Sequence, residues 1–311
     1  MELTVHEYSF KSSSGLCDIY ATSAVPASFS DVKGVVQIAH GMAEHSARYA
    51  EFAKALAERG YAVFINDHLG HGKSVASKED LGFFGPMGYD ALVKDMKQLT
   101  EIAKKEYPEL PFIIFGHSMG SFLAREYTAR YGHEIDGAIF CGTAGPNPAA
   151  SLGITLAKHF EKSKGDHVRS SFLNSMAFGS YNKKTEQRTE FDWLTKDTAI
   201  VDKYIADEYC GYCFTANGFV GLFSVLKQVS SKLWFNTVPK ELPMLLIAGA
   251  DDPVGAYGKG VKQVFDQLKE TGHTNTLMKL YAGDRHEILN ELDKEQVISD
   301  VIDWIDKTAV K

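Results

Sequence analysis

The sequence predicts an α/β fold in which a mostly parallel central sheet is covered by helices on both faces and carries a helical insertion. Short apolar segments typical of buried strands alternate with amphipathic segments of helical period through most of the chain. With 311 residues, the chain is long enough to bury a substantial apolar interior. The alternation stops between about residues 145 and 239, where amphipathic pieces occur without a clear buried strand.

The first two predicted strands, Thr4–Phe10 and Leu16–Ala21, alternate apolar and polar residues around a Ser-Ser-Ser-Gly turn. This pattern predicts an antiparallel hairpin at the edge of the sheet. The six predicted strands that follow are short and apolar, as expected of strands buried on both faces: Val35–Ala39, Ala62–Asp67, Phe112–Phe115, Ala138–Cys141, Met244–Ala248 and Thr276–Tyr281. The accompanying predicted helices are Tyr49–Glu58, Tyr89–Glu106, Phe122–Tyr131, Gly258–Lys269 and Glu295–Lys307.

The break in the alternation predicts two structural parts. Residues 1–144 and 240–311 form the expected core, and residues 145–239 form an expected helical cap. An insertion at this point of the chain lies over the carboxyl ends of the parallel strands, where open α/β sheets bind their ligands. We therefore expect the cap to cover the functional site.

The charge and hydropathy patterns exclude several classes of protein. The formal net charge is −7 and no basic run occurs, so nucleic acid is not an expected partner. No apolar stretch is long enough to span a bilayer, and the first seven residues lack a signal-peptide pattern. These features predict a cytoplasmic protein.

The four cysteines are too few for a disulfide framework in a chain of this length. Cys17 and Cys141 stand in apolar surroundings and are expected to pack as small hydrophobic residues. Cys210 and Cys213 have the spacing of a redox motif or half a zinc site, but no second pair accompanies them. Packing is the preferred interpretation of this pair, with redox or metal binding as the alternative.

The pentapeptide Gly116-His117-Ser118-Met119-Gly120 carries the main chemical signal. It follows an apolar strand and precedes a predicted helix, which is the context of a nucleophile elbow. The two glycines allow strand and helix to pack closely around a serine at the apex of a sharp turn. Ser118 is therefore the predicted nucleophile.

A serine hydroxyl needs a base to remove its proton, and the base needs an acid to orient it. Asp251 and Asp252 follow one predicted strand, and His286 follows the last one, so the candidates appear in the order Ser, Asp, His. Position favours His286 among the eleven histidines as the base. Both aspartates remain candidates for the acid on this pattern, with Asp252 preferred.

Acyl transfer also requires two N–H donors directed at the developing oxyanion. One is expected from the backbone of Met119, at the start of the helix after Ser118. The other is expected from the backbone of Met42, in the loop after the first buried strand. Further residues, polar apart from Gly41, are expected to support the site through hydrogen bonds: His40, Gly41, Glu44, His45, Asp67, His68, His71 and His117. A metal site built from His40, His45 and His71 is the weaker alternative, so no metal and no cofactor are predicted.

Five segments, spread over nearly the whole length of the chain, carry a family resemblance: His40–Tyr49, Asp67–Ser74, Gly116–Gly120, Gly249–Val254 and Arg285–Glu287. On these segments the chain resembles the α/β-hydrolase superfamily, in particular its monoacylglycerol lipase and lysophospholipase branch among the serine aminopeptidase-type hydrolases. The resemblance implies that Ser118, Asp252 and His286 are the triad and that Met42 and Met119 supply the oxyanion hole.

The expected function is therefore that of a serine carboxylester hydrolase acting on a single-chain acyl ester, a lipid such as a monoacylglycerol. The same fold can serve other functions. The alternatives are lysophospholipid or short-chain ester hydrolysis, acyl transfer to an alcohol, aminopeptidase activity and a non-catalytic ligand-binding role. An aminopeptidase would need acidic side chains in the cap pocket. The residues considered for that role are Asp192, Asp197, Asp202, Asp207 and Glu208.

The cap also has two apolar segments, Ser151–Ala157 and Phe214–Leu226. Each is compatible with transient contact with a membrane or micelle surface and equally with packing inside the cap. The sequence leaves this choice open, and it does not indicate an oligomeric state.

Overall fold

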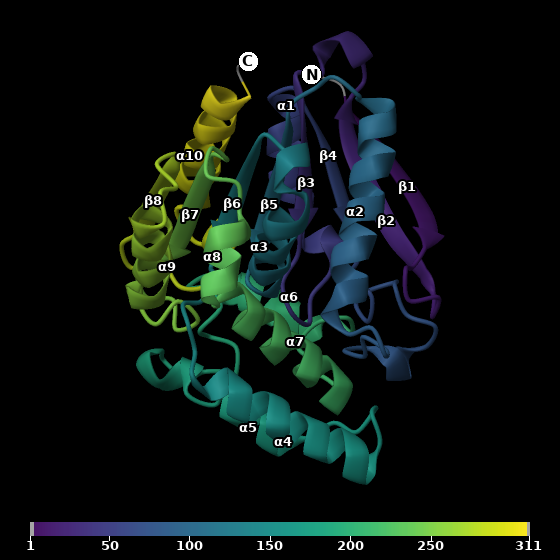
Figure 1. The fold of residues 1–311 in the computed structure, drawn as a ribbon, viewed down its shortest axis with the longest axis vertical. Coiled ribbons are helices and arrows are strands. Elements are labelled where there is room, and N and C mark those ends of the chain that lie inside the picture. The colour runs from purple at the N-terminus through teal and green to yellow at the C-terminus, as the bar shows by residue number, and fades with distance from the viewer. Residues whose placement is uncertain (1–2, 310–311) are drawn as a thin grey trace.

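The computed structural model describes residues 3–309 and confirms the predicted α/β fold class (Figure 1). Its single sheet has eight strands in the order β1-β2-β4-β3-β5-β6-β7-β8. The first two, β1 (Leu3–Lys11) and β2 (Asp18–Pro26), form the predicted antiparallel hairpin, and β2 pairs antiparallel with β4 (Tyr61–Asn66). On its other side β4 pairs parallel with β3 (Gly34–Ala39), as predicted. The remaining strands predicted to be parallel are also parallel: β5 (Phe112–His117), β6 (Gly137–Cys141), β7 (Met244–Gly249) and β8 (Thr276–Tyr281).

Two layers of helices cover the two faces of the sheet. On one face α1 (Ala50–Glu58) and α10 (Lys294–Thr308) pack on the residues of one apolar cluster. On the other face lie α2 (Tyr89–Glu106), α3 (Met119–Tyr131) and α9 (Lys259–Glu270). Burial of both faces explains why the central strands are apolar throughout rather than alternating.

The helix α3 begins three residues earlier than the sequence pattern predicts, at Met119 instead of Phe122. The reason is local: Ser118 occupies the N-cap position, so the helix starts directly after the elbow. Its early residues are small or flexible, and this weakens the periodic signal from which a helix start is read.

Between β6 and β7 the chain forms helices and no named strand, as the sequence pattern predicts. These elements are α4 (Ala149–Lys164), α5 (Ser171–Phe178), α6 (Thr198–Ala206), α7 (Ala216–Val229) and α8 (Lys232–Thr237). Figure 1 shows α4 and α5 as an outer layer beyond one end of the sheet, with α7 between them and the core. The division into a core and a cap at residues 145 and 239 remains a prediction.

The apolar segment Phe214–Leu226 contributes mainly to packing, because Phe214 and Phe219 are completely buried. In the segment Ser151–Ala157, by contrast, Leu152 of α4 is 58% exposed. Across residues 3–309, no helix combines the length and apolar character needed to cross a membrane.

Candidate active site

Ser118 stands at a strained turn between β5 and α3. Its backbone has φ 54° and ψ −121°, a conformation that costs free energy in any residue with a side chain. A Cβ atom on Gly120 would collide with the carbonyl oxygens of Ala39 and His40, so only glycine allows α3 to approach β3 this closely. The turn leaves Ser118 partly exposed at the wall of a cavity, while both of its neighbours are buried.

The structure brings Asp252 and His286 together beyond the ends of β7 and β8. Nδ1 of His286 lies 3.0 Å from Oδ1 of Asp252, and both side chains are buried. That separation is within hydrogen-bonding length, although the orientation of the ring leaves Nδ1 without an aligned hydrogen bond. Asp251, the other sequence candidate, is exposed and is not the carboxylate beside His286.

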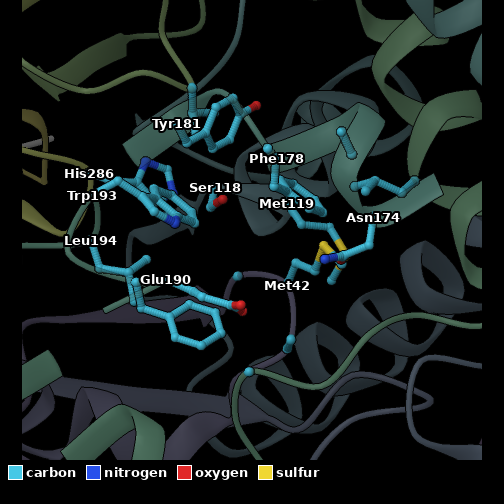
Figure 2. Close-up of a pocket in the computed structure, with 18 of the residues that line it drawn as sticks. Met42, Ser118, Met119, Asn174, Phe178, Tyr181, Glu190, Trp193, Leu194 and His286 are labelled. Atoms are coloured by element: carbon cyan, nitrogen blue, oxygen red, sulfur yellow. The ribbon is translucent and has the colours of Figure 1, made fainter. Parts of the chain in front are cut away.

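The imidazole of His286 lies close to two other aromatic rings. Its centroid lies 4.8 Å from that of His117 and 5.1 Å from that of Trp193. His286 and Ser118 line the same cavity, and Figure 2 shows them together with Trp193 and Tyr181. The sequence pattern assigned no role to Trp193.

The two backbone segments predicted to supply the oxyanion donors both adjoin Ser118. Met119 is the first residue of α3, so its N–H has no intrahelical acceptor. The loop after β3 approaches from the other side, since a Cβ atom on Gly41 would lie 3.2 Å from Cβ of Ser118. Met42, the next residue, lines the cavity together with Met119 (Figure 2).

A buried charged network supports this loop. Oε1 of Glu44 accepts a hydrogen bond from the Gly41 N–H at 2.5 Å, and Oε2 pairs with Arg48 at 2.5 Å. Arg48 also donates hydrogen bonds of 2.7 Å to both carboxylate oxygens of Glu287, the residue that follows His286. The network therefore links the loop after β3 directly to the loop after β8.

Charges in the network control its protonation states. Burial by itself would raise the pKa of Glu44, but Arg48 and the His117 ring outweigh burial and hold that pKa well below its usual value. Burial would lower the pKa of His117, yet Glu44 raises it above the ordinary histidine value. The carboxylate is therefore ionised at neutral pH and remains an acceptor for the Gly41 N–H.

Hydrogen bonds to the side chains of Asp67 and His40 fix the turn after β4. The two carboxylate oxygens of Asp67 each accept a backbone N–H at 2.8 Å, from Ser46 and from Lys73. Nε2 of His40 accepts the backbone N–H of His68 at 2.9 Å. These bonds agree with the structural role expected for Asp67, His40 and His68.

The alternative three-histidine metal site is not formed. His40 and His71 are neighbours, with ring centroids 5.2 Å apart, but Nε2 of His45 faces Asp207 at 2.9 Å. Among residues 3–309, the three histidines do not converge as a set of metal ligands.

The cavity next to Ser118 has a volume of about 870 Å³ and is lined by residues of both predicted parts. Its apolar wall includes Phe178 from α5 and Leu222, Phe223 and Leu226 from α7. Its polar lining includes Asn174, Asn182, Gln187, Arg188 and Glu190. A cavity of this size and composition accommodates a ligand with a long apolar part and a polar group.

The acidic residues considered for binding an ammonium group do not line this cavity. Each has another partner: Asp192 accepts from Thr189, Asp197 caps α6, Asp202 pairs with Arg188, Asp207 with His45, and Glu208 with Lys78. Glu190, which no sequence pattern indicated, does line the cavity and is labelled in Figure 2. Its position in an irregular segment gave no periodic signal.

Comparison with known proteins gives one consistent family. The profile of the family described as "Serine aminopeptidase, S33" matches residues 30–293. The monoacylglycerol lipase of Mycolicibacterium smegmatis is 29% identical to this chain, over 88% of this chain and 89% of the relative. The human monoglyceride lipase is 26% identical over 88% and 82% of the two chains.

A solved structure extends this likeness to the whole chain. The highly thermostable carboxyl esterase of Bacillus coagulans, in complex with glycerol, superposes with a TM-score of 0.92 at 33% sequence identity. The match covers 98% of this chain and 99% of the esterase. With its sheet, its serine elbow and a family profile that covers most of its length, the chain belongs to the serine aminopeptidase S33 family of α/β-hydrolases.

Proposed function

We propose that this protein is a serine carboxylester hydrolase that cleaves single-chain acyl esters, with a monoacylglycerol as the preferred substrate. The observation that carries the proposal is that Ser118 and His286 line one cavity with an apolar wall, while the carboxylate of Asp252 lies 3.0 Å from Nδ1 of His286. Relatives named monoacylglycerol lipase or monoglyceride lipase match 88% of the chain, which supports the same substrate class.

In the proposed mechanism, Oγ of Ser118 attacks the ester carbonyl while Nε2 of His286 takes the hydroxyl proton. Asp252 orients the imidazole through its Nδ1 side and stabilises the imidazolium. The N–H groups of Met42 and Met119 stabilise the negative charge on the carbonyl oxygen. His286 then gives its proton to the departing alcohol, and water attacks the acyl-enzyme with the same histidine as base. The proposed chemistry requires no metal or cofactor.

The cavity supports a lipid substrate in two ways. Phe178, Leu222 and Phe223 offer apolar surface to an acyl chain, and removal of that chain from water favours binding. Asn174 and Glu190 offer hydrogen-bonding groups for a hydroxylated head group. Glu190 also provides the carboxylate that an aminopeptidase would need for a substrate ammonium group, so that activity is the second candidate.

Transient contact with a lipid surface is part of the proposal. Leu152 and Phe172, on α4 and α5, are 58% and 57% exposed and lie on the outer layer of the molecule. Large exposed apolar side chains near the cavity favour an orientation in which a substrate passes from a membrane or micelle. A cytoplasmic location and this surface contact remain predictions.

The test compares wild type with Ser118→Ala on four substrates: a monoacylglycerol, lysophosphatidylcholine, a short nitrophenyl ester and a proline anilide. We expect the highest kcat/KM for the monoacylglycerol and a loss of about 10⁶ in kcat for the variant, as for removal of a nucleophile in a comparable triad. A higher kcat/KM for another ester would support the proposed chemistry but indicate a different substrate. A higher kcat/KM for the anilide would favour aminopeptidase activity. If no substrate is turned over and a fluorophosphonate does not label Ser118, the proposal that this protein is a serine hydrolase is refuted.

A further inference from the structure

A cluster of three metal-ligating side chains lies outside the catalytic cavity. His45 comes from the loop after β3, and Asp207 and Cys210 come from the segment that follows α6. One donor atom from each side chain lies within 4.8 Å of the other two. His45 and Asp207 are 162 residues apart in sequence, so only the tertiary fold brings them together. Among residues 3–309, no other group of three or more His, Cys, Asp or Glu residues converges in this way.

Hydrogen bonds arrange the cluster before any ion binds. Oδ1 of Asp207 accepts the backbone N–H of Tyr209 at 2.9 Å, and Oδ2 lies 2.9 Å from Nε2 of His45. The backbone N–H of Cys210 donates to the carbonyl oxygen of Asp207 at 3.0 Å, which closes a turn and returns the thiol toward the carboxylate. All three ligand residues are half-buried, so an ion could enter and would still be partly shielded from water.

The donor set has the chemistry of a zinc site. Zn²⁺ binds imidazole nitrogen, thiolate sulfur and carboxylate oxygen in tetrahedral sites, and three protein ligands leave one position for water. Bond lengths of about 2.0–2.3 Å place tetrahedral ligand atoms about 3.3–3.6 Å apart. The three donor atoms lie within 4.8 Å of one another, and Nε2 of His45 is 2.9 Å from Oδ2 of Asp207. An ion would therefore replace this hydrogen bond, and rotation of the side chains would adjust the ligand spacing.

We propose that His45, Asp207 and Cys210 form a binding site for Zn²⁺ that joins the loop after β3 to the segment after α6. Binding replaces the thiol proton of Cys210, which passes to solvent, and uses His45 as the tautomer with a free Nε2 lone pair. The ion acts outside the cavity, because none of the three side chains lines it. It therefore has no part in the acyl-transfer chemistry.

The proposed ion strengthens an existing connection. The carbonyl oxygen of Ala43 already accepts hydrogen bonds from the Gly211 N–H and from the Tyr204 hydroxyl, each at 3.0 Å. Ala43 follows Met42, whose N–H is one of the two proposed oxyanion donors. Zinc at the cluster would hold this loop against the cap segment and thereby stabilise the folded state, since an ion that binds only the native protein shifts the unfolding equilibrium.

The experiment is a calorimetric titration of the full, untagged, chelator-treated chain with ZnCl₂. We expect one ion per chain, a proton release detectable by comparing buffers of different ionisation enthalpy, and a melting temperature that rises with Zn²⁺ concentration. Cys210→Ala and Asp207→Asn each remove a direct ligand and should weaken binding by at least about 100-fold, the upper end of the loss caused by removal of an outer partner.

Cys213→Ala is the matched control, because the Cys213 thiol lies near the carbonyl oxygens of Ser170 and Phe214 rather than at the cluster. This variant should bind Zn²⁺ like wild type. With Co²⁺ in place of Zn²⁺, the thiolate charge-transfer absorption should appear in wild type and in Cys213→Ala and be lost in Cys210→Ala. Far-ultraviolet circular dichroism and thermal melting without metal establish that each variant is folded. If Cys210→Ala does not fold, the Zn²⁺ affinity of Asp207→Asn tests the proposal instead.

Equal Zn²⁺ affinity in wild type, Cys210→Ala and Asp207→Asn would overturn the proposal, as would an absence of binding in wild type. Loss of binding in Cys213→Ala alone would overturn it as well and assign the ion to another thiol. None of these results depends on ester hydrolysis, so they are independent of the proposed enzymatic function.

Discussion

The carboxylate of Glu44 accepts a hydrogen bond from the backbone N–H of Gly41 at 2.5 Å. The same carboxylate accepts the Tyr49 hydroxyl at 2.8 Å and pairs with Arg48. A side chain thus fixes the backbone of the turn immediately before Met42. The relationship makes Glu44 a positioning residue for the oxyanion loop, with no direct contact with substrate required.

Glu44→Ala should lower kcat by about 10–100-fold with little change in KM. Loss of an oxyanion donor costs about 10²–10³ in kcat, and a displaced donor costs less than an absent one. Glu44→Gln keeps an acceptor for the Gly41 N–H and should recover part of the rate. Steady-state kinetics on the preferred ester measure both variants, and an increase in KM at constant kcat would contradict the positioning role.

Asp252→Asn should reduce kcat by about 10⁴, because an amide at this position no longer favours the reactive tautomer of the histidine or stabilises its imidazolium. Asp251→Asn is the matched control, since the neighbouring carboxylate is exposed and does not contact His286. It should retain nearly the full rate. Equal losses in the two variants would mean that loop integrity, rather than the carboxylate beside His286, determines the rate.

The free energy of unfolding should fall as the pH decreases from about 6.5 to 5. Burial lowers the pKa of His40, His68 and His71 below the value of about 6.5 that histidine has in an unfolded chain. The unfolded state therefore binds more protons in this range and is favoured as the pH falls. The raised pKa values of His117 and of Asp284, the latter to about 6, act in the opposite direction and reduce the effect.

Urea denaturation at several pH values measures this dependence, and His71→Asn provides the comparison. Nδ1–H of His71 lies 3.2 Å from the Leu69 carbonyl oxygen, a bond that an asparagine amide can replace without a titrating group. The variant should show a slope lower by up to about 1.4 kcal/mol per pH unit. An unchanged slope would show that His71 does not contribute to the acid sensitivity.

Gly120→Ala should destabilise the fold by more than about 3 kcal/mol, because its methyl group meets the backbone of Ala39 and His40, which cannot move without disturbing the sheet. Gly15→Ala is the control, because it introduces backbone strain without a steric collision. Gly15 has φ +73° and open space around its Cβ position, so the cost should be about 1–2 kcal/mol. Chemical denaturation measures both, and similar losses would contradict the role of close packing at Gly120.

Much of the fold was predictable because its signals are local. Seven of the eight predicted strands appear in the sheet within two residues of their expected bounds, and the hairpin turns where the serines and glycine indicate. The second strand begins two residues later than predicted and continues five residues further, to Pro26. The sequence also points to Ser118 and His286 as candidates, because the elbow and the strand ends are encoded by neighbouring residues. The choice between Asp251 and Asp252 was not decided by the residue pattern itself, since both carboxylates follow the same strand.

The sequence by itself determined the order of strands and helices, the elbow, and the loops that bear the candidate triad, because hydrophobic period and glycine positions act over a few residues. Only the tertiary structure decided which side chains meet across long separations. The Trp193 ring lies beside His286, Glu190 lines the cavity, and His45 lies close to Asp207 and Cys210. Such contacts depend on how irregular segments fold back onto the core, and that path is set by packing of the whole chain rather than by any local pattern.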